Sequence, residues 1–165
     1  GRIGRLLIPL FLYQKRTLAS PMFYLSEYLE THRENYYQRL LAISDDGDWT
    51  GWVEFFLAAI EQQALRNTGR VKGILDLYQS MKTRVTEITH SQYSPAILDA
   101  IFDRPIFQAA DFVTRSAIPQ PTAKTALRKL REAGVLTALR ESSGNRPAVL
   151  AFPELVNLAE GHEIM

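Results

Sequence analysis

Apolar residues recur at helical spacing over the first half of the chain. The run from Ile3 to about Arg16 is apolar on nearly every face, which predicts a helix surrounded by others, and Pro9 inside it predicts a kink. Trp49 to Gln63 carries one apolar stripe, and Val71 to about Ile88 continues with a similar helical pattern. No stretch of residues 1–90 alternates as a strand would, so this region is predicted to be all-helical.

Shorter signals mark where these helices begin and end. Ser20-Pro21 predicts a helix start, with an N-cap before a proline, and Thr31-His32-Arg33-Glu34 fits a capping box. Asp48 is predicted to cap the helix that starts at Trp49, and Asn67-Thr68-Gly69 to break or loosen it. The residues predicted to be buried are Tyr36, Tyr37, Leu40, Leu41 and Ile43 in the helix after the capping box, and Trp52, Phe55, Phe56, Ala59 and Ile60 in the helix after Asp48.

The pattern changes after a polar segment, residues 89–95, which is the predicted linker. Beyond it, helices are predicted at 95–102, 109–116, 122–133 and 153–160, and extended segments at 104–107, 135–139 and 148–152. Gly134 is predicted to end the third of these helices in the left-handed conformation. The chain is therefore predicted to be mainly α, with a helical bundle over residues 1–90 and a small α+β domain over residues 91–165.

Composition sets a few limits on function. The 165 residues carry a net charge of +1 and 46% of them are hydrophobic, which is typical of a globular protein and argues against one that coats nucleic acid broadly. The chain has no cysteine, so disulfide and thiolate chemistry are excluded, and a cytoplasmic location is expected. The longest apolar run, Leu6 to Tyr13, is far below the roughly 20 residues that span a bilayer, so no membrane partner is expected.

The first residues of the chain combine the features of an anion site. Gly1-Arg2-Ile3-Gly4-Arg5 opens the first predicted helix. A helix N-terminus offers free backbone N–H groups and a partial positive charge, which suit a phosphate. Arg2 and Arg5 lie on neighbouring turns and can add two charge-assisted hydrogen-bonding forks to the same ligand.

This opening resembles part of a known family signature. Gly1-Arg2-Ile3-Gly4-Arg5-Leu6-Leu7-Ile8 is similar to the closing half of the Fic signature, H-P-F-x-[D/E]-G-N-G-R-x-x-R, followed by that family's central helix. Gly1 matches the last glycine of the G-N-G run, and Arg2 and Arg5 match the two arginines. The resemblance covers about residues 1–90 and continues through three further segments, Ser20 to Tyr28, Asn35 to Leu40 and Trp49 to Leu57.

The resemblance implies a protein adenylyltransferase. In the Fic family a histidine acts as general base, an acid holds Mg²⁺, and the glycine-rich loop with its arginines holds the phosphates of ATP while AMP moves to a Ser, Thr or Tyr hydroxyl of a target protein. Gly1, Arg2 and Arg5 match the phosphate-binding part, and Arg5 is expected to matter most. The catalytic histidine, the metal-binding acid and the asparagine of the signature would lie upstream of Gly1.

Nothing in the 165 residues replaces these missing groups. His32, His90 and His162 are far apart and share no triad or metal-ligand spacing, so each is interpreted as a surface or lightly packed histidine, and no metal site is predicted. The intact parent is expected to use ATP and Mg²⁺. This chain alone is expected to bind neither tightly and to transfer no AMP.

The C-terminal pattern resembles a second family. Helix, strand, helix, tight turn, helix and hairpin is the order of a winged helix-turn-helix, and Ala123 to Leu136 is similar to the recognition helix and exit of many bacterial regulators. Many Fic proteins carry such a module after the catalytic domain. Base contacts are expected from Gln120, Thr122, Lys124, Thr125 and Arg128, phosphate contacts from Lys129 and Arg131, and wing-tip contacts from Asn145 and Arg146.

The charge pattern leaves alternatives open. From Lys124 to Glu132 four basic residues stand against one acid, but over residues 94–165 eight basic residues are balanced by eight acids. Because DNA affinity rests mainly on phosphate neutralisation, this balance weakens the case for DNA binding, although DNA remains the favoured partner. Winged helices also serve to dock a protein or to form a homodimer. The alternative for the whole chain is a DNA-binding regulator whose helical part dimerises or senses a signal.

Overall fold

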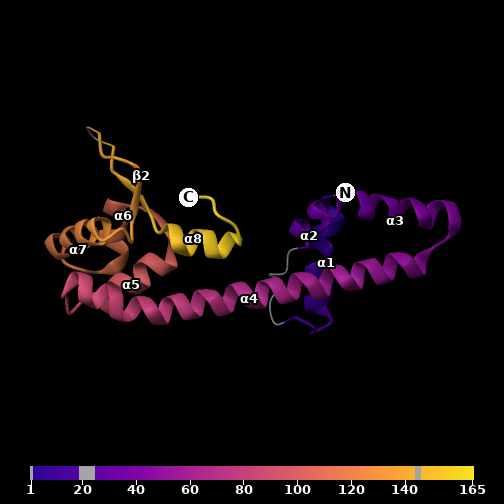
Figure 1. Cartoon of the computed structure of the whole chain (residues 1–165), viewed down its shortest axis with the longest axis horizontal. Helices are drawn as coiled ribbons and strands as arrows, with labels where there is room; N and C mark the ends of the chain where they lie inside the picture. Colours follow the sequence, from indigo (N-terminus) through magenta and orange to yellow (C-terminus); the bar gives the residue numbers. More distant parts are fainter. Residues whose placement is uncertain (1, 19–24, 144–145) are drawn as a thin grey trace. The chain divides into compact units, whose positions relative to one another are not determined.

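The chain consists of two compact units, residues 1–68 and 69–165 (Figure 1). The computed structural model describes residues 2–18, 25–143 and 146–165, with the side chains of residues 2–6 and 8 outside the description. Ser20-Pro21, a predicted helix start, lies outside the described residues. The boundary between the units falls inside a single helix, α4 (Trp49–Thr89), which is continuous through Asn67-Thr68-Gly69. Of the two outcomes predicted for this point, a break or a loosening of the helix, the break is therefore wrong.

The described residues of the first unit form helices and the short turns that join them. It contains α1 (Arg2–Gln14), α2 (Ser26–Thr31), α3 (Arg33–Asp46) and the first part of α4. Its core joins Leu25, Tyr28 and Leu29 to Phe55 and Ala59 of α4. Phe55 and Ala59 are buried, and the neighbouring Trp52, Phe56 and Ile60 pack against them, as the amphipathic pattern predicts.

The helix starts predicted around α3 and α4 differ in outcome. Asp48 caps α4 as predicted, because its Oδ1 accepts a hydrogen bond of 2.8 Å from the backbone N–H of Gly51. The predicted capping box is wrong. Thr31 is the last residue of α2, and its hydroxyl donates to the carbonyl of Glu27 at 2.9 Å, so it cannot serve α3. The N-cap of α3, His32, makes no side-chain cap.

Two helices of the first unit expose apolar side chains that the sequence predicts to be buried. On α1, Leu7 and Phe11 are 58% and 56% exposed, although the pattern predicts a helix surrounded by others. No side chain of α3 is fully buried, and Tyr37 and Leu41 lie open to solvent. The physical reason is that the described helices of this unit cover only the stripe of α4 around Phe55.

The second unit combines helices with a small antiparallel sheet. After the last part of α4 it contains α5 (Ser94–Asp103), β1 (Ile106–Gln108), α6 (Ala109–Ser116), α7 (Gln120–Glu132), β2 (Thr137–Arg140), β3 (Val149–Ala151) and α8 (Pro153–Glu160). The sheet order is β1-β3-β2, with Leu150 of β3 aligned with Phe107 on one side and Ala138 on the other. The order of helices and strands predicted from the sequence is confirmed, to within a few residues at each end.

One continuous core holds this unit together. Phe112 of α6, Leu130 of α7 and Leu150 of β3 are buried in it, so the two helices and the sheet share one apolar centre. Met81 and Val85 of α4 belong to the same core. The last turns of α4 therefore pack as part of the second unit. The assignment of residues 1–90 and 91–165 to two family domains stays a prediction.

The exit of α7 is a glycine-dependent turn. Gly134 has a φ of +72°, and the backbone N–H of Val135 donates to the carbonyl of Leu130 at 2.9 Å. This 6→1 bond is the mark of a Schellman motif, in which the left-handed residue ends the helix. The prediction for Gly134 is confirmed.

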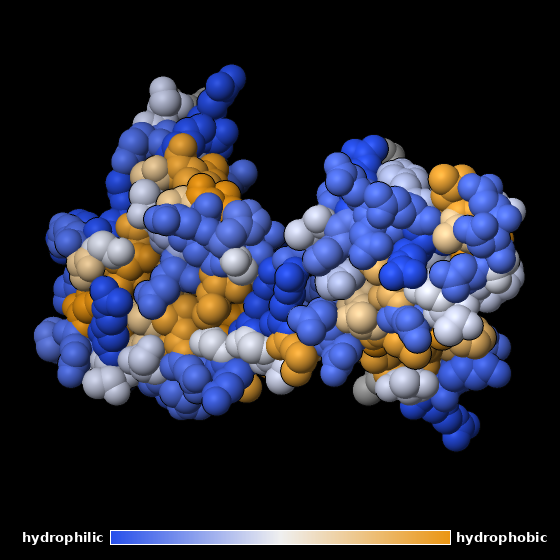
Figure 2. Space-filling view, turned by 45° about the vertical axis from the view of Figure 1, so that its right-hand side comes forward, coloured by the Kyte–Doolittle hydropathy of each residue, from blue (hydrophilic) through white to orange (hydrophobic). Residues whose placement is uncertain are grey.

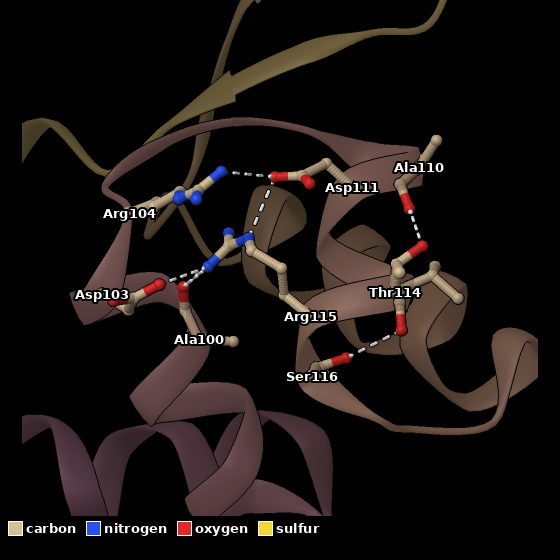
Figure 3. A network of polar contacts seen from close by, with 9 residues as sticks. Ala100, Asp103, Arg104, Ala110, Asp111, Thr114, Arg115 and Ser116 are labelled. Atoms are coloured by element: carbon tan, nitrogen blue, oxygen red, sulfur yellow. Dashed lines mark hydrogen bonds and ion pairs between the residues drawn. The ribbon is translucent and has the colours of Figure 1, made fainter.

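A half-buried arginine joins the end of α5 to α6 (Figure 3). Arg115, whose side chain is only 16% exposed, reaches Asp103 at 2.8 Å and Asp111 at 2.9 Å, and it donates to the carbonyl of Ala100 at 3.3 Å. Arg104 lies 3.6 Å from the same Asp111 carboxylate. These charge-assisted contacts tie the end of α5 to α6, which immediately precedes α7.

Candidate nucleic-acid interface

The helix α7 presents one face to the core and the other to solvent. Its first turn follows Pro119 and contains Pro121, which fixes the backbone φ at a point where no helical N–H is needed. The inward face consists of Ala123, Ala126, Leu127 and Leu130, all buried. On the outward face Gln120, Lys124, Thr125 and Arg128 are exposed, while Thr122 is half-buried. The residues predicted to contact bases therefore lie on one helix, and four of the five are open to solvent.

Two of the predicted DNA-binding arginines are engaged by acids. Arg128 Nη1 lies 2.7 Å from Glu132 Oε1 and 2.9 Å from Oε2, one turn along α7. Arg131 Nη2 lies 2.5 Å from Glu141, just beyond β2. Among the residues that the structure describes, Lys124 makes no such ion pair.

Lys129 has a different environment from the other cations of α7. Its Nζ donates to the backbone carbonyl of Thr89 at 3.0 Å, at the C-terminal end of α4. A cation at this point also meets the negative end of the helix dipole. The position predicted for a phosphate contact thus ties α7 to α4.

A groove of about 780 Å³ runs between α7 and the β2–β3 hairpin. Its floor is mostly apolar and includes Leu127, Ala138 and Leu150. Lys124, the two arginine–glutamate pairs and Thr137 lie along its lining. In Figure 2 hydrophilic residues form much of the surface of this unit, with apolar patches between them.

The hairpin supplies one further predicted contact. Arg146 is exposed, and its backbone pairs with Ser143 through bonds of 3.0 and 3.1 Å. Asn145, the other predicted wing-tip residue, lies outside the described residues. The exposed Arg140 of β2, which is not among the predicted contacts, donates to the carbonyl of Pro147 at 3.3 Å and adds a cation near the hairpin.

Sequence reasoning also misses the two acids of this surface. Glu132 follows Arg128 at the i,i+4 spacing that favours an ion pair on a helix, so that signal was present in the sequence. Glu141 lies ten residues after Arg131 and meets it only because the chain turns back at Gly134. No sequence signal reveals this second pair.

Most of the predicted phosphate-binding site lies outside the described residues. Gly1 and the side chains of Arg2 and Arg5 lie outside the described residues, and α1 begins at Arg2. Within the part of the chain that is described, no three His, Asp or Glu side chains converge as metal ligands.

The three histidines have separate environments. His32 stacks on Tyr28 with ring centroids 4.0 Å apart, and its Nδ1 donates a hydrogen bond of 2.9 Å to the backbone carbonyl of Tyr28. His162 donates to the carbonyl of Glu160 at 3.2 Å, and His90 is exposed.

No protein-family model matches the chain. In the described ranges, no helix has both the length and the apolar character needed to cross a bilayer.

Proposed function

We propose that the chain is the C-terminal part of a Fic-type protein adenylyltransferase and that its second unit is a winged helix that binds DNA. The observation that carries the DNA-binding part is the outward face of α7. A helix whose four inward residues are buried presents Lys124, Thr125 and Arg128 together to solvent. The order of helices and strands and the β1-β3-β2 sheet support the winged-helix part of the proposal.

The exposed residues divide by chemistry into two roles. Gln120, Thr125 and Arg128 carry donors and acceptors that can read base edges in a major groove, with arginine best matched to guanine. Lys124 and the hairpin's Arg146 are suited to phosphates, which position the protein on the duplex. Lys129 is engaged by Thr89 and contributes less than its charge suggests.

Fluorescence anisotropy with labelled mixed-sequence duplex DNA tests the proposal. Binding is expected at low salt, with a steep loss as salt rises. Arg128→Ala should weaken it, by an amount that corresponds to about 1 kcal/mol or more at a guanine-containing site. Arg84→Ala is the matched control, because Arg84 is an exposed arginine of the same unit on α4, paired with Glu154. If the chain binds no duplex at low salt, docking of a protein becomes the better account of this surface.

The adenylyltransferase part rests on the resemblance of Gly1-Arg2-Ile3-Gly4-Arg5 to the Fic signature. The exposed apolar residues Leu7, Leu10 and Phe11 support it, since a central helix of a larger helical domain needs cover on several sides. In the intact protein Arg2 and Arg5 would hold the phosphates of ATP, and a bound Mg²⁺ would neutralise part of the phosphate charge. AMP would pass to a Ser, Thr or Tyr hydroxyl of a target protein, with pyrophosphate as the leaving group and the hydroxyl proton taken by the upstream histidine.

Two experiments test the enzymatic part. The sequence encoded immediately upstream of Gly1 should be His-Pro-Phe-x-Asp/Glu-Gly-Asn, and any other sequence there would overturn the assignment. The protein that includes this motif should transfer labelled AMP to a target, and Arg5→Ala should reduce the transfer strongly. The 165-residue chain alone should transfer none, so labelled product from it would contradict the residue roles.

A second candidate is a DNA-binding regulator whose first unit dimerises. The exposed Tyr37 and Leu41 of α3 and the exposed Trp49 and Val53 of α4 favour it, because apolar side chains in such numbers often mark an interface. Sedimentation of the chain separates the two candidates. A dimer that Leu41→Asp dissociates supports the regulator, whereas a monomer at all concentrations removes its basis.

A further inference from the structure

We propose that Glu132 and Glu141 act as internal competitors for DNA phosphate and thereby set how strongly α7 discriminates between sequences. The inference rests on the proposed DNA-binding function and assigns a regulatory role within that same surface. It concerns two acids that are neither buried nor part of a core. Their side chains are 60% and 67% exposed.

Each of the two ion pairs contains one of the arginines that would contact DNA. Arg128 meets both carboxylate oxygens of Glu132 through one guanidinium nitrogen, and Arg131 meets Glu141 across the groove beside β2. Both acids line the same groove as the two arginines. A phosphate that approaches either arginine therefore meets a carboxylate already in place.

A guanidinium binds a carboxylate and a phosphate through the same planar fork of N–H donors. A phosphate contact by Arg128 or Arg131 thus requires the glutamate to leave. Exposed ion pairs of this kind are weak, so the exchange is allowed. The displaced carboxylate still lies within a few ångströms of the phosphate and repels it, because the Debye length exceeds that distance at ordinary salt.

The repulsion does not weigh equally on all DNA sequences. On a mismatched sequence Arg128 gains only a phosphate contact in exchange for Glu132. On a matched sequence it gains two hydrogen bonds to a guanine edge, which offset the loss of the pair. The acid thus penalises the wrong partner more than the right one, which is a known route to specificity.

The position of Lys124 fits this division. Lys124 lies on the N-terminal half of α7 and makes no ion pair with the residues that the structure describes, whereas both pairs involve the C-terminal half. Lys124 is therefore available for the first encounter, and the glutamates act on contacts that form later.

The test compares charge-neutral variants with a control of equal charge change. Glu132→Gln and Glu141→Gln each remove one acid from the groove. Glu154→Gln is the control, since Glu154 is 58% exposed on α8 and pairs with Arg84 at 3.9 Å, away from α7. Binding is measured by anisotropy at low salt with a mixed-sequence duplex and with a duplex selected from a random library by the wild-type chain.

Each groove variant should bind the mixed-sequence duplex about threefold more tightly than wild type, the size expected of one charge removed near several phosphates. Glu132→Gln should gain less on the selected duplex, so that the ratio of specific to non-specific affinity falls. Glu154→Gln should match wild type on both.

The failures of this inference and of the proposed function are distinguishable. If wild type binds DNA and the groove variants bind no better than Glu154→Gln, the competitor role is refuted and DNA binding stands. If the groove variants bind and wild type does not, the competitor role is supported in its strongest form. If no version binds either duplex, the proposed function itself is overturned, and the inference with it.

Discussion

Substitution of Gly134 tests how much of the second unit depends on one backbone conformation. The residue has a φ of +72°, and a Cβ built on it would meet nothing within 4 Å. A substitution therefore introduces no clash, and its effect comes from the left-handed backbone alone. That conformation costs an L-residue roughly 1–2 kcal/mol, less for Asn and more for a β-branched side chain.

Three variants give a graded series. The free energy of opening the turn after α7 should fall by about 1 kcal/mol in Gly134→Ala and by about half of that in Gly134→Asn. In Gly134→Val it should fall by clearly more than in Gly134→Ala. The amides of Val135 and Leu136 report the opening directly, because both donate to the carbonyl of Leu130, at 2.9 and 3.2 Å. A loss of 1 kcal/mol corresponds to about fivefold faster hydrogen exchange at these amides.

Native-state hydrogen exchange followed by NMR is the assay. Trp49 and Trp52, the two tryptophans of the chain, both belong to the first unit, so the thermal transition followed by their fluorescence is an internal control that should stay unchanged. If Gly134→Asn accelerates hydrogen exchange as much as Gly134→Val does, the left-handed conformation is not what Gly134 provides. The same conclusion follows if Gly134→Ala changes the exchange rate of the Val135 amide by less than about twofold.

Two further predictions follow from single contacts. A Cβ on Gly73 of α4 would lie 2.9 Å from Leu158 Cδ1 of α8, and the two further methyl groups of valine would displace this half-buried side chain, so Gly73→Val should destabilise the second unit by about 1 kcal/mol in urea unfolding. Gly69→Ala, which meets nothing within 4 Å in the same helix, should stabilise the chain, and loss of stability at both sites would refute the contact argument. Tyr78 donates a hydrogen bond of 2.6 Å to Asp99, and this bond raises the pKa of Tyr78 above 10.0. The native state therefore holds the phenolic proton more tightly than the unfolded chain, and the stability due to this bond is lost as pH rises through the native pKa. Asp99→Asn should lower the pKa of Tyr78 in a ¹³C NMR titration, and an unchanged value would show that the bond does not control it.

Local signals explain which parts of the fold the sequence predicts well. The bounds of α6 and α8 and the left-handed Gly134 depend on prolines, glycines and short apolar repeats that act within a few residues. The hairpin follows from β-propensity on either side of a turn-rich segment. These features need no knowledge of distant parts of the chain.

Features that depend on distant partners escape the sequence. Lys129 has the position of a phosphate contact but meets the carbonyl of Thr89, forty residues earlier. Arg115 resembles any surface cation in the sequence, and only the approach of Asp103 and Asp111 explains its burial. The apolar pattern of α1 predicts that other segments pack over Leu7 and its neighbours, but it does not identify those segments.

The participation of α4 in both units has a practical consequence for anyone who wishes to study the C-terminal part alone. An excised fragment that starts after the polar segment at residues 89–95 would leave out Leu77, Met81 and Val85, and so would open the apolar centre around Phe112 to water. A protease would find no loop at the 68/69 boundary, because the backbone there is helical. The second unit thus packs around a core of its own, but no loop at the 68/69 boundary separates it from the first unit. A fragment of it would have to begin near Gly69.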